Sequence, residues 1–358
     1  MRTRLSPNEI EAEITERWRR VLQLEGTPSS DDFFELGGTS LEAMQLLTGI
    51  EEDLGLAVSL AAFAERPTLQ GLLEELQAAR GERTSSLVTL QPNGTGAPFF
   101  FMHAGLGHAV FAHDLAKSMS EDQPLYGLQS RGLDGREEPL TTIGAMAAHY
   151  IDAMKTVQPH GPYRVGGFCM GAMLALEVAC QLQDAGEEVS HLVVFSTDAF
   201  WKRASGIRDQ LELHRREIAG RGMGGAVWYI RSRLHFRLYR LYSIGVILLQ
   251  RLYAARGNSL PPRLRYVYIA QLNYRSSWRY QPRRFHGTIS YFQGDADRLR
   301  DPIPFWAKLA THGVEMHSVA GELEHMFDPP HVEHLAAALS QCLGRSAAEV
   351  PRRQALRP

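Results

Sequence analysis

The chain has 358 residues, 44% of them hydrophobic and 22% charged, which is the composition of a globular protein with enough apolar residues for more than one core. Its formal net charge of −2 excludes the strong basic field on which nucleic-acid binding usually depends. The cysteine spacing matches neither a disulfide framework nor a metal site, and no apolar stretch reaches the length of a membrane span. We therefore expect a cytoplasmic protein that binds no nucleic acid, membrane or metal.

The near-neutral total hides two segments of opposite charge. Residues 1–80 hold seven Arg, no Lys and fifteen acidic residues, for a net charge of −8, whereas residues 201–285 carry a net charge of +15. Such segregation indicates separate structural units, and the opposite signs indicate that these units can dock on each other.

The first predicted element is a helix from Pro7 to about Gln23, because a capping box over residues 6–9 precedes apolar residues at helical spacing. A second amphipathic helix is predicted to begin at Ser40. A serine at a helix start most often caps the helix, but two glycines precede this one and permit close approach by another protein. A helix N-terminus also favours a phosphate ester.

The sequence around Ser40 resembles the attachment motif of peptidyl and acyl carrier proteins of assembly-line enzymes, through Phe33-Phe34-x-Leu36-Gly37-Gly38-x-Ser40-Leu41. This resemblance covers about residues 5–78. It implies a small all-α four-helix bundle over residues 1–78, in which a phosphopantetheinyl transferase attaches 4′-phosphopantetheine to Ser40 and the arm tethers an acyl or peptidyl substrate. Residues 79–86 are small and polar, which predicts a linker.

After the linker, short apolar runs alternate with helical segments, which predicts a mainly parallel sheet covered by helices on both faces. Residues 92–96 separate the first two runs and indicate a turn or a hairpin. The predicted strands are Leu87–Leu90, Phe99–Met102, Leu125–Leu128, Tyr163–Val165, Leu192–Phe195, Ile289–Phe292 and Val314–Val319. The predicted helices are Ile143–Val157, Met170–Asp184 and His331–Leu343.

The most informative motif follows the fourth apolar run, where Gly167-Phe168-Cys169-Met170-Gly171 joins a strand to a helix. This is the nucleophile-elbow pattern, with sulfur in place of the usual hydroxyl oxygen. Glycines are expected there because the turn strains the backbone of the nucleophile and leaves no room for side chains. Cys169 is therefore the predicted nucleophile, and the adjacent helix N-terminus favours its thiolate form.

A thiol nucleophile needs a base, and His325 is the predicted one. It follows the last predicted strand, so the chain order of nucleophile, acid and histidine in this architecture is satisfied. Two carboxylates compete for the acid role: Asp198 follows the strand that ends at Phe195, and Asp297 follows the strand of residues 289–292. The residues alone leave this choice open.

Negative charge that develops on the substrate oxygen requires hydrogen-bond donors, and the predicted donors are the backbone N–H groups of Gly105 and Met170. Gly105 belongs to the glycine-containing loop after the first long predicted strand. His103, at the end of that strand, is expected to have a structural role near this loop.

Residues 87–345 resemble a type I thioesterase of a nonribosomal peptide or polyketide synthetase. This resemblance implies an α/β-hydrolase fold with a helical lid at about residues 200–286, followed by a tail at residues 346–358. With the carrier ahead of it, the chain resembles the C-terminal carrier and thioesterase pair of an assembly line, whose partners are the upstream synthetase modules. The segments that carry the resemblance are Phe100-Phe-Met-His-Ala-Gly-Leu-Gly107, the elbow around Cys169, and Gly321-x-x-x-His325.

In that family the acyl chain passes from the arm to the nucleophile and is then released. Most relatives have serine in place of Cys169, and the minority with cysteine includes thioesterases that form strained lactones, β-lactones among them. The family's usual acid ends the strand where this chain has Ser196. That departure leaves Asp198, two residues on, or Asp297, the position used by many stand-alone thioesterases.

Sulfur at position 169 affects how the product is expected to leave. Transfer to a cysteine makes another thioester, nearly isoenergetic with the incoming one, whereas transfer to a serine makes a less reactive ester. We therefore expect release by cyclisation to a lactone or lactam, or by transfer to an acceptor. The alternatives are hydrolysis to the free acid, editing of wrongly loaded carriers, and a non-catalytic carrier and docking module.

Overall fold

The structure, a computed structural model, describes residues 7–24, 32–54, 58, 60–78, 86–135, 137–195, 241–294, 303–321 and 325–344. The predicted linker, apart from Ser86, and the predicted tail lie outside the described residues. The helices are α1 (Pro7–Leu22), α2 (Ser40–Leu54), α3 (Leu60–Glu65), α4 (Leu69–Ala78), η1 (Val110–Ala112), α5 (His113–Ser118), α6 (Ile143–Lys155), α7 (Gly171–Asp184), α11 (Pro262–Arg279), α12 (Ile303–Trp306) and α13 (His331–Leu343). The strands are β1 (Leu87–Gln91), β2 (Phe99–Met102), β3 (Leu125–Leu128), β4 (Tyr163–Phe168), β5 (Val189–Phe195), β6 (Ile289–Gly294) and β7 (Val314–Val319).

Helices α1 to α4 enclose a hydrophobic core of their own. At its centre the rings of Trp18, Phe33 and Phe63 are fully buried and meet edge to face, with centroids 5.1–5.8 Å apart. Each buried ring contributes roughly 1.5–3 kcal/mol by leaving water. Helix α1 has the bounds that the apolar spacing predicts, and α2 begins at Ser40 as expected.

The seven strands form one sheet in the order β1-β3-β2-β4-β5-β6-β7. Neighbouring strands from β3 to β7 run parallel, and β1 is antiparallel to β3. The predicted mainly parallel sheet is therefore confirmed, with all seven predicted strands in it. The hairpin interpretation of the first two strands is wrong, because β2 pairs with β3 and β4 on its two sides and has no free edge for β1.

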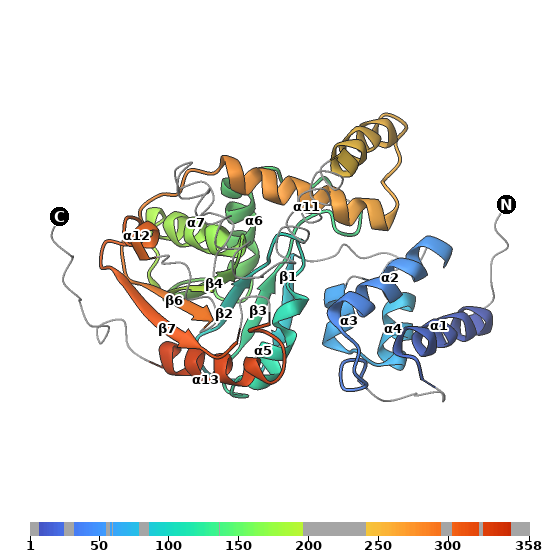
Figure 1. Ribbon diagram of the computed structural model, residues 1–358, viewed down its shortest axis with the longest axis horizontal. Helices are drawn as coiled ribbons and strands as arrows, with labels where there is room; N and C mark the ends of the chain where they lie inside the picture. The colour runs from blue at the N-terminus through green and yellow to red at the C-terminus, as the bar shows by residue number, and fades with distance from the viewer. Residues whose placement is uncertain are drawn as a thin grey trace, which may run out of the picture.

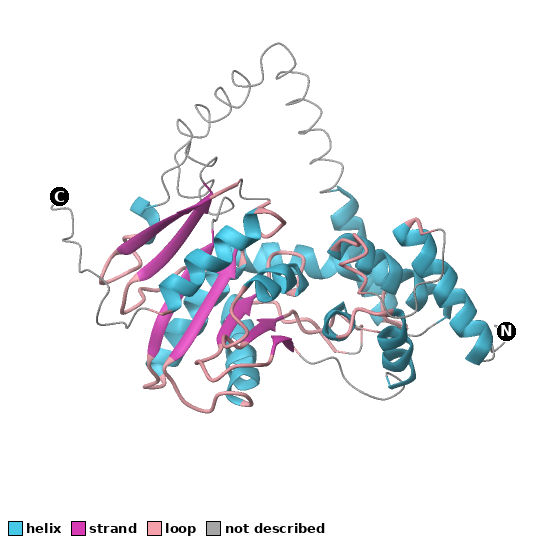
Figure 2. Cartoon of the chain, turned by 90° about the horizontal axis from the view of Figure 1, so that it is seen from below, coloured by secondary structure: helices cyan, strands magenta, loops and turns pink. Residues whose placement is uncertain are grey.

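Helices cover both faces of this sheet, with α6 and α7 on one side and α5 and α13 on the other (Figures 1 and 2). Side chains along a strand alternate between these layers: Phe100 and Met102 join the core of α6 and α7, whereas Phe99 and Phe101 join that of α5 and α13. Because both faces are buried, β2 reads as a continuous apolar run rather than an alternating one.

The acidic helical unit docks on the basic part of the α/β unit, as the charge pattern predicts. Helix α2 contacts α11, and α3 contacts β1 (Figure 1). Arg265 of α11 donates to both carboxylate oxygens of Glu51 in α2 at 2.8 Å, and Arg263 lies 3.2 Å from the Glu52 carboxylate. Opposite charges thus meet directly at this contact.

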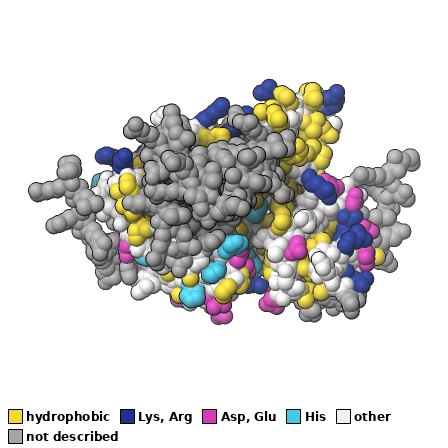
Figure 3. Space-filling model, in the orientation of Figure 1, with side chains coloured by type: hydrophobic (Ala, Val, Ile, Leu, Met, Phe, Trp, Pro, Cys, Tyr) yellow, Lys and Arg dark blue, Asp and Glu magenta, His cyan; other side chains and the backbone are white. Residues whose placement is uncertain are grey.

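Residues 241–254 form a helix that presents hydrophobic side chains at the surface (Figure 3). On one face of this helix, Ser243 and Val246 are buried. On its other faces the exposed hydrophobic side chains are those of Leu241, Ile244, Leu248 and Leu252. Of the predicted lid, this helix and α11 are described, and residues 200–240 lie outside the described residues. Neither these two helices nor any other in the described part of the chain is long and apolar enough to cross a membrane.

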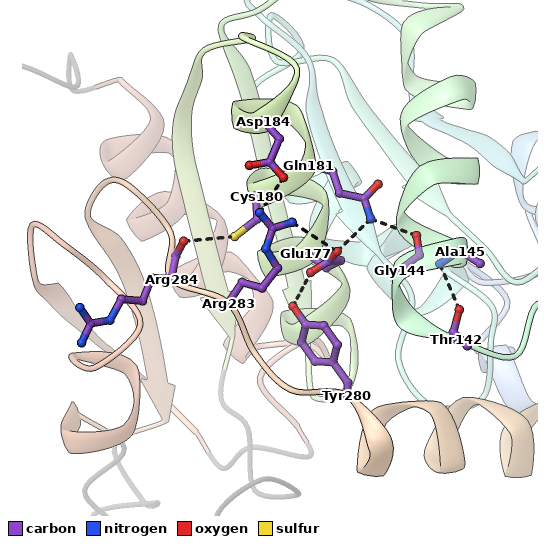
Figure 4. Close-up of polar contacts among 10 residues, drawn as sticks. All are labelled: Thr142, Gly144, Ala145, Glu177, Cys180, Gln181, Asp184, Tyr280, Arg283 and Arg284. Carbon is purple, nitrogen blue, oxygen red and sulfur yellow. Dashed lines mark hydrogen bonds and ion pairs between the residues drawn. The ribbon is translucent and has the colours of Figure 1, made fainter.

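A buried carboxylate joins α7 to the segment that follows α11 (Figure 4). Glu177 is 6% exposed, and it accepts hydrogen bonds from the Tyr280 hydroxyl at 2.7 Å and from Gln181 at 2.9 Å. Arg283 lies 3.9 Å from Glu177 and pairs with Asp184 at 2.6 Å. Burial raises the pKa of Tyr280 above its ordinary value, so its hydroxyl stays a donor. Since a buried carboxylate needs such donors, this cluster ties the C-terminal end of α11 to the core.

We expect Tyr280→Phe to lower the free energy of unfolding by about 1–3 kcal/mol, because it leaves Glu177 buried with one donor fewer. Urea denaturation measures this change. Tyr126→Phe is the matched control, since the Tyr126 ring stacks on Phe100 and its hydroxyl bonds to none of the described residues. Its expected effect is within about 0.5 kcal/mol. Equal effects of the two substitutions would show that the Tyr280 hydroxyl does not support Glu177.

Candidate active site

Cys169 stands at the turn between β4 and α7, where the elbow motif predicts it. Its φ of +56° puts a non-glycine residue in the left-handed region, at a cost of roughly 1–2 kcal/mol. Its N–H donates to the Phe195 carbonyl at 3.4 Å, and its own carbonyl accepts from the Ala172 N–H at 3.3 Å. The half-buried cysteine is thus held in a strained conformation at the carboxyl edge of the sheet.

Two glycines make this turn possible. A Cβ atom on Gly167 would collide with the backbone of Gly171, and a Cβ atom on Gly171 would lie 2.5 Å from the carbonyl oxygen of Met102 at the end of β2. The strand and the start of the helix therefore approach more closely than any side chain would allow. This is the packing role that the sequence predicts for both glycines.

His325 lies in a turn after β7 that packs against the elbow. Phe327 in the same turn is buried, and its ring centroid lies 5.1 Å from that of Phe168, the residue before Cys169, and 5.7 Å from that of Phe195. The His325 side chain itself is exposed. Aromatic packing therefore brings the segments that carry the predicted base and the predicted nucleophile together.

The two predicted acids, Asp198 and Asp297, lie outside the described residues. The strands before them are described: β5 pairs with β4 and β6 pairs with β5, all in parallel. Both strands therefore end at the sheet edge that holds Cys169.

A third carboxylate, which the sequence analysis missed, reaches His325 within the described residues. Asp328 Oδ2 lies 3.1 Å from His325 Nδ1. The spacing of three residues within a turn is the signal that predicts such a contact. The two side chains are 62% and 60% exposed, so water screens this pair strongly.

One predicted oxyanion donor, Met170, lies in the elbow, and the other, Gly105, lies in the neighbouring loop after β2. Within the described part of the chain, the N–H groups of Gly105 and Met170 donate to no acceptor. Helix α7 begins at Gly171, so the Met170 N–H is one of the unpaired donors at a helix N-terminus. The Gly105 carbonyl accepts from the Asn273 side chain at 3.1 Å, and Tyr274 packs so closely that a Cβ atom on Gly105 would lie 2.5 Å from its ring.

A buried hydrogen-bond network supports the loop of residues 103–107. The ring nitrogens of His103 lie 2.6 Å from the next backbone carbonyl and 2.7 Å from the Tyr150 hydroxyl. Ser130 Oγ lies 3.1 Å from His103 Nε2 and 3.0 Å from Asn273 Nδ2. Burial lowers the pKa of His103 to about 4, so the imidazole is neutral near pH 7. His103 therefore has the structural role that the sequence predicts.

Ser40 is the first residue of α2 but does not cap it. The Thr39 hydroxyl accepts the Glu42 N–H at 3.3 Å, and the Glu42 carboxylate accepts the Thr39 N–H at 2.8 Å, so these two residues form the capping box. The Ser40 hydroxyl bonds to none of the described residues. Its oxygen is thus available for modification beside the N–H groups of a helix N-terminus.

The described residues contain no cluster of three or more side chains suited to a metal ion.

His108 is a buried imidazole outside the network. It is 7% exposed, and neither of its ring nitrogens has a hydrogen-bond partner among the described residues. Burial lowers its pKa to about 4. Because histidine in the unfolded chain titrates near pH 6.5, unfolding takes up a proton between about pH 6.5 and pH 4, and the stability is lost as the pH falls through this window.

We expect His108→Leu to reduce the dependence of the unfolding free energy on pH. Titration of His108 should lower the stability of the wild type by about 2 kcal/mol between pH 7 and pH 5, and leucine removes that titration. Urea denaturation at both pH values measures the difference. His334→Leu, at an exposed histidine of α13, is the control and should keep the wild-type dependence. The same dependence in His108→Leu would contradict the assignment.

Two family models match the chain. Residues 12–76 match the phosphopantetheine attachment site, and residues 97–217 match the thioesterase domain. The first match implies a covalently attached 4′-phosphopantetheine.

Curated relatives are synthetases of which this chain spans a small part. The indigoidine synthase of Dickeya dadantii is 36% identical over 189 residues, which cover 53% of this chain and 13% of that protein. The dimodular nonribosomal peptide synthase of Bacillus subtilis is 37% identical over 213 residues, which cover 59% of this chain and 9% of that protein.

Solved structures share the fold. The four domain nonribosomal peptide synthetase holo-AB3403 matches 96% of this chain and 27% of its own, with a TM-score of 0.57 and 22% identity. The NocB thioesterase domain, in covalent complex with a fluorophosphonate nocardicin G analog, matches 73% of this chain and 100% of its own, with a TM-score of 0.53 and 24% identity. The chain therefore contains a phosphopantetheine-binding carrier domain followed by a thioesterase domain with an α/β-hydrolase-like fold, and it is similar over these residues to parts of nonribosomal peptide synthetases.

Proposed function

We propose that this chain releases an acyl or peptidyl product from a carrier-bound thioester through a covalent intermediate on Cys169. The observation that supports this most strongly is the left-handed φ of Cys169 between two glycines that admit no side chain. A cysteine that served only to fill a core would need no strained turn at the edge of the sheet. The unit of α1 to α4 acts in this proposal as the four-helix carrier of residues 1–78.

Ser40 is the proposed attachment residue for 4′-phosphopantetheine. Its unbonded hydroxyl at the start of α2 fits a phosphate ester, because a helix N-terminus stabilises an anion. When bound, the group supplies a terminal thiol that carries the cargo as a thioester. The proposed partners are a phosphopantetheinyl transferase, which attaches the group, and upstream synthetase modules, which supply the cargo.

The proposed reaction begins at Cys169, whose thiolate attacks the thioester carbonyl after His325 has taken its proton. The N–H groups of Gly105 and Met170 donate hydrogen bonds to the carbonyl oxygen as it becomes negative. His325 then gives the proton to the departing thiol, and the cargo is held as a thioester on Cys169. In the second half, His325 removes a proton from the hydroxyl, amine or water that attacks this thioester. The bond between the acyl carbon and the Cys169 sulfur then breaks, and His325 returns the proton to that sulfur.

A strand-end aspartate, Asp198 or Asp297, is the proposed partner that orients His325. The acid of a triad must fix the imidazole tautomer and stabilise the imidazolium, which works best where water is excluded. The Asp328 carboxylate is too exposed for this role, because a screened surface pair contributes little. The ends of β5 and β6 lie at the edge that holds Cys169, which supports either strand-end residue.

Sulfur at position 169 supports cyclisation or acyl transfer as the mode of release. The thioester on Cys169 keeps nearly the full reactivity of the incoming thioester, so a weak or strained nucleophile, such as a hydroxyl or amine of the cargo itself, can still attack it. An ester on serine would lose that reactivity before the second step. Hydrolysis to the free acid is the outcome that the experiment below distinguishes from this mode.

We expect chains loaded on Ser40 to show an acyl adduct on Cys169, detected by intact-protein mass spectrometry and located by peptide mapping. Cys169→Ala should abolish that adduct and slow release by about 10³-fold or more, because the covalent path is lost. Cys169→Ser should form an ester and shift the product towards free acid.

Three outcomes contradict parts of this proposal. Release at the wild-type rate from Cys169→Ala would favour the alternative that the chain is a non-catalytic carrier and docking module. Charged Ser40 without any adduct on Cys169 would exclude the covalent path. Free acid as the sole wild-type product would reject cyclisation and transfer in favour of hydrolysis.

We also expect the carboxylate variants to separate into two groups. Either Asp198→Asn or Asp297→Asn should lower kcat by about 10²–10⁴-fold, because His325 loses its orienting acid. Asp328→Asn should lower kcat by less than about tenfold, since the pair it removes is exposed. Cleavage of a soluble N-acetylcysteamine thioester measures all three, with urea denaturation as a check on folding. A large loss of kcat confined to Asp328→Asn would show that Asp328 is the acid that orients His325.

A further inference from the structure

We infer that Arg265 selects the carrier that docks on the thioesterase, by requiring a carboxylate eleven residues after the modified serine. In this chain that carboxylate is Glu51 of α2. The inference rests on the proposed function, because it concerns the presentation of Ser40 to the site around Cys169. The residues involved belong to neither the nucleophile nor the oxyanion loop.

Arg265 is a buried cation at the contact between the two units. Its side chain is 6% exposed, and its Nη2 donates to both carboxylate oxygens of Glu51 at 2.8 Å. Its Nη1 donates to the Asp134 carbonyl at 3.0 Å, and the loop at Gly135 leaves no space between its backbone and the guanidinium for a side chain. The guanidinium therefore packs between the thioesterase loop at Gly135 and Glu51 of the carrier.

The pair is desolvated in the docked arrangement, where the Arg265 side chain is 6% exposed. A buried guanidinium without a counter-charge costs several kcal/mol, whereas a guanidinium that water can reach has no such penalty. A carrier with a neutral residue in place of Glu51 would bury an unpaired charge on Arg265 as it docked. The pair thus discriminates between carriers more than it strengthens the contact.

The other ion pairs of this contact differ in exposure. The Arg263 and Glu52 side chains are 73% and 27% exposed, and Lys117, which is 41% exposed, pairs with Asp32 and Glu35, which are 19% and 75% exposed. Such partly solvated pairs speed the encounter of oppositely charged surfaces and contribute little to discrimination. Arg265, the most buried cation among these pairs, therefore makes the largest contribution to discrimination between carriers.

Helix geometry links Glu51 to the modified serine. Eleven residues make about three helical turns, so Glu51 and Ser40 lie on one face of α2, roughly 16 Å apart. Met44 and Thr48 of this face line a pocket of about 520 Å³ whose other wall includes Leu106, the neighbour of Gly105. A carrier held at Glu51 therefore turns the face that carries its modified serine towards the oxyanion loop.

The test compares Glu51→Gln with the unaltered 358-residue chain. A phosphopantetheinyl transferase and hexanoyl-CoA load Ser40, and the rate of single-turnover release is measured. The reference is the rate at which the same chain cleaves soluble hexanoyl N-acetylcysteamine thioester, which needs no docked carrier. The quantity compared between variants is the ratio of the first rate to the second. We expect this ratio to fall about tenfold or more in Glu51→Gln. Glu52→Gln removes the neighbouring exposed pair and is the matched control, with an expected change below about threefold.

Amide hydrogen exchange of the unloaded chains measures docking without any catalytic readout. Glu51→Gln should raise exchange in α11 and in residues 131–135. Adding Arg265→Met to Glu51→Gln should restore both the protection and the ratio, because an apolar side chain needs no counter-charge.

Unchanged protection and an unchanged ratio in Glu51→Gln would overturn the inference. So would losses that persist in the double variant, since they would assign Glu51 a structural role. Failure of the unaltered chain to cleave either thioester would contradict the proposed function instead, and the exchange data would still decide the inference.

Discussion

The left-handed backbone of Cys169 is the constraint on which the rest of the thioesterase domain depends. A cysteine keeps a φ of +56° only where its surroundings outweigh the strain. Here β4 is paired on both sides in a parallel sheet, and α7 packs on that sheet so closely that Gly167 and Gly171 admit no side chain. The buried layers on both faces of the sheet thus supply the rigidity that this strained turn requires.

Helix α11 connects carrier docking to the oxyanion loop. Near its start Arg265 pairs with the carrier, and about two turns later Asn273 and Tyr274 contact Gly105. The same Asn273 side chain bonds to Ser130, and through it to the buried His103 network. One rigid helix therefore sets the position of the docked carrier and of the proposed oxyanion donor relative to each other.

The fold and the elbow are predictable from the sequence because they depend on local patterns. Apolar runs bounded by turn residues mark all seven strands, and the spacing of Gly167, Cys169 and Gly171 specifies a strand, a turn and a helix within a few residues. The pairing of β1 with β3 was not predictable in this way, since strand order depends on contacts between distant segments. The same holds for the pair of Arg265 with Glu51. Charge segregation predicts that the units meet, but only the fold selects Arg265 among the seventeen arginines of residues 201–285.

A buried ion pair suits the docking and release of a carrier that the proposed function requires. A large apolar interface would be stronger, but it would expose hydrophobic surface whenever the carrier left to receive its next cargo. Charged groups are stable in water when apart, and a desolvated pair adds little net affinity while it penalises a carrier that lacks the matching charge. The contact between α2 and α11 thus favours exchange and correct pairing over strength, which suits the proposed transfer of cargo from a carrier.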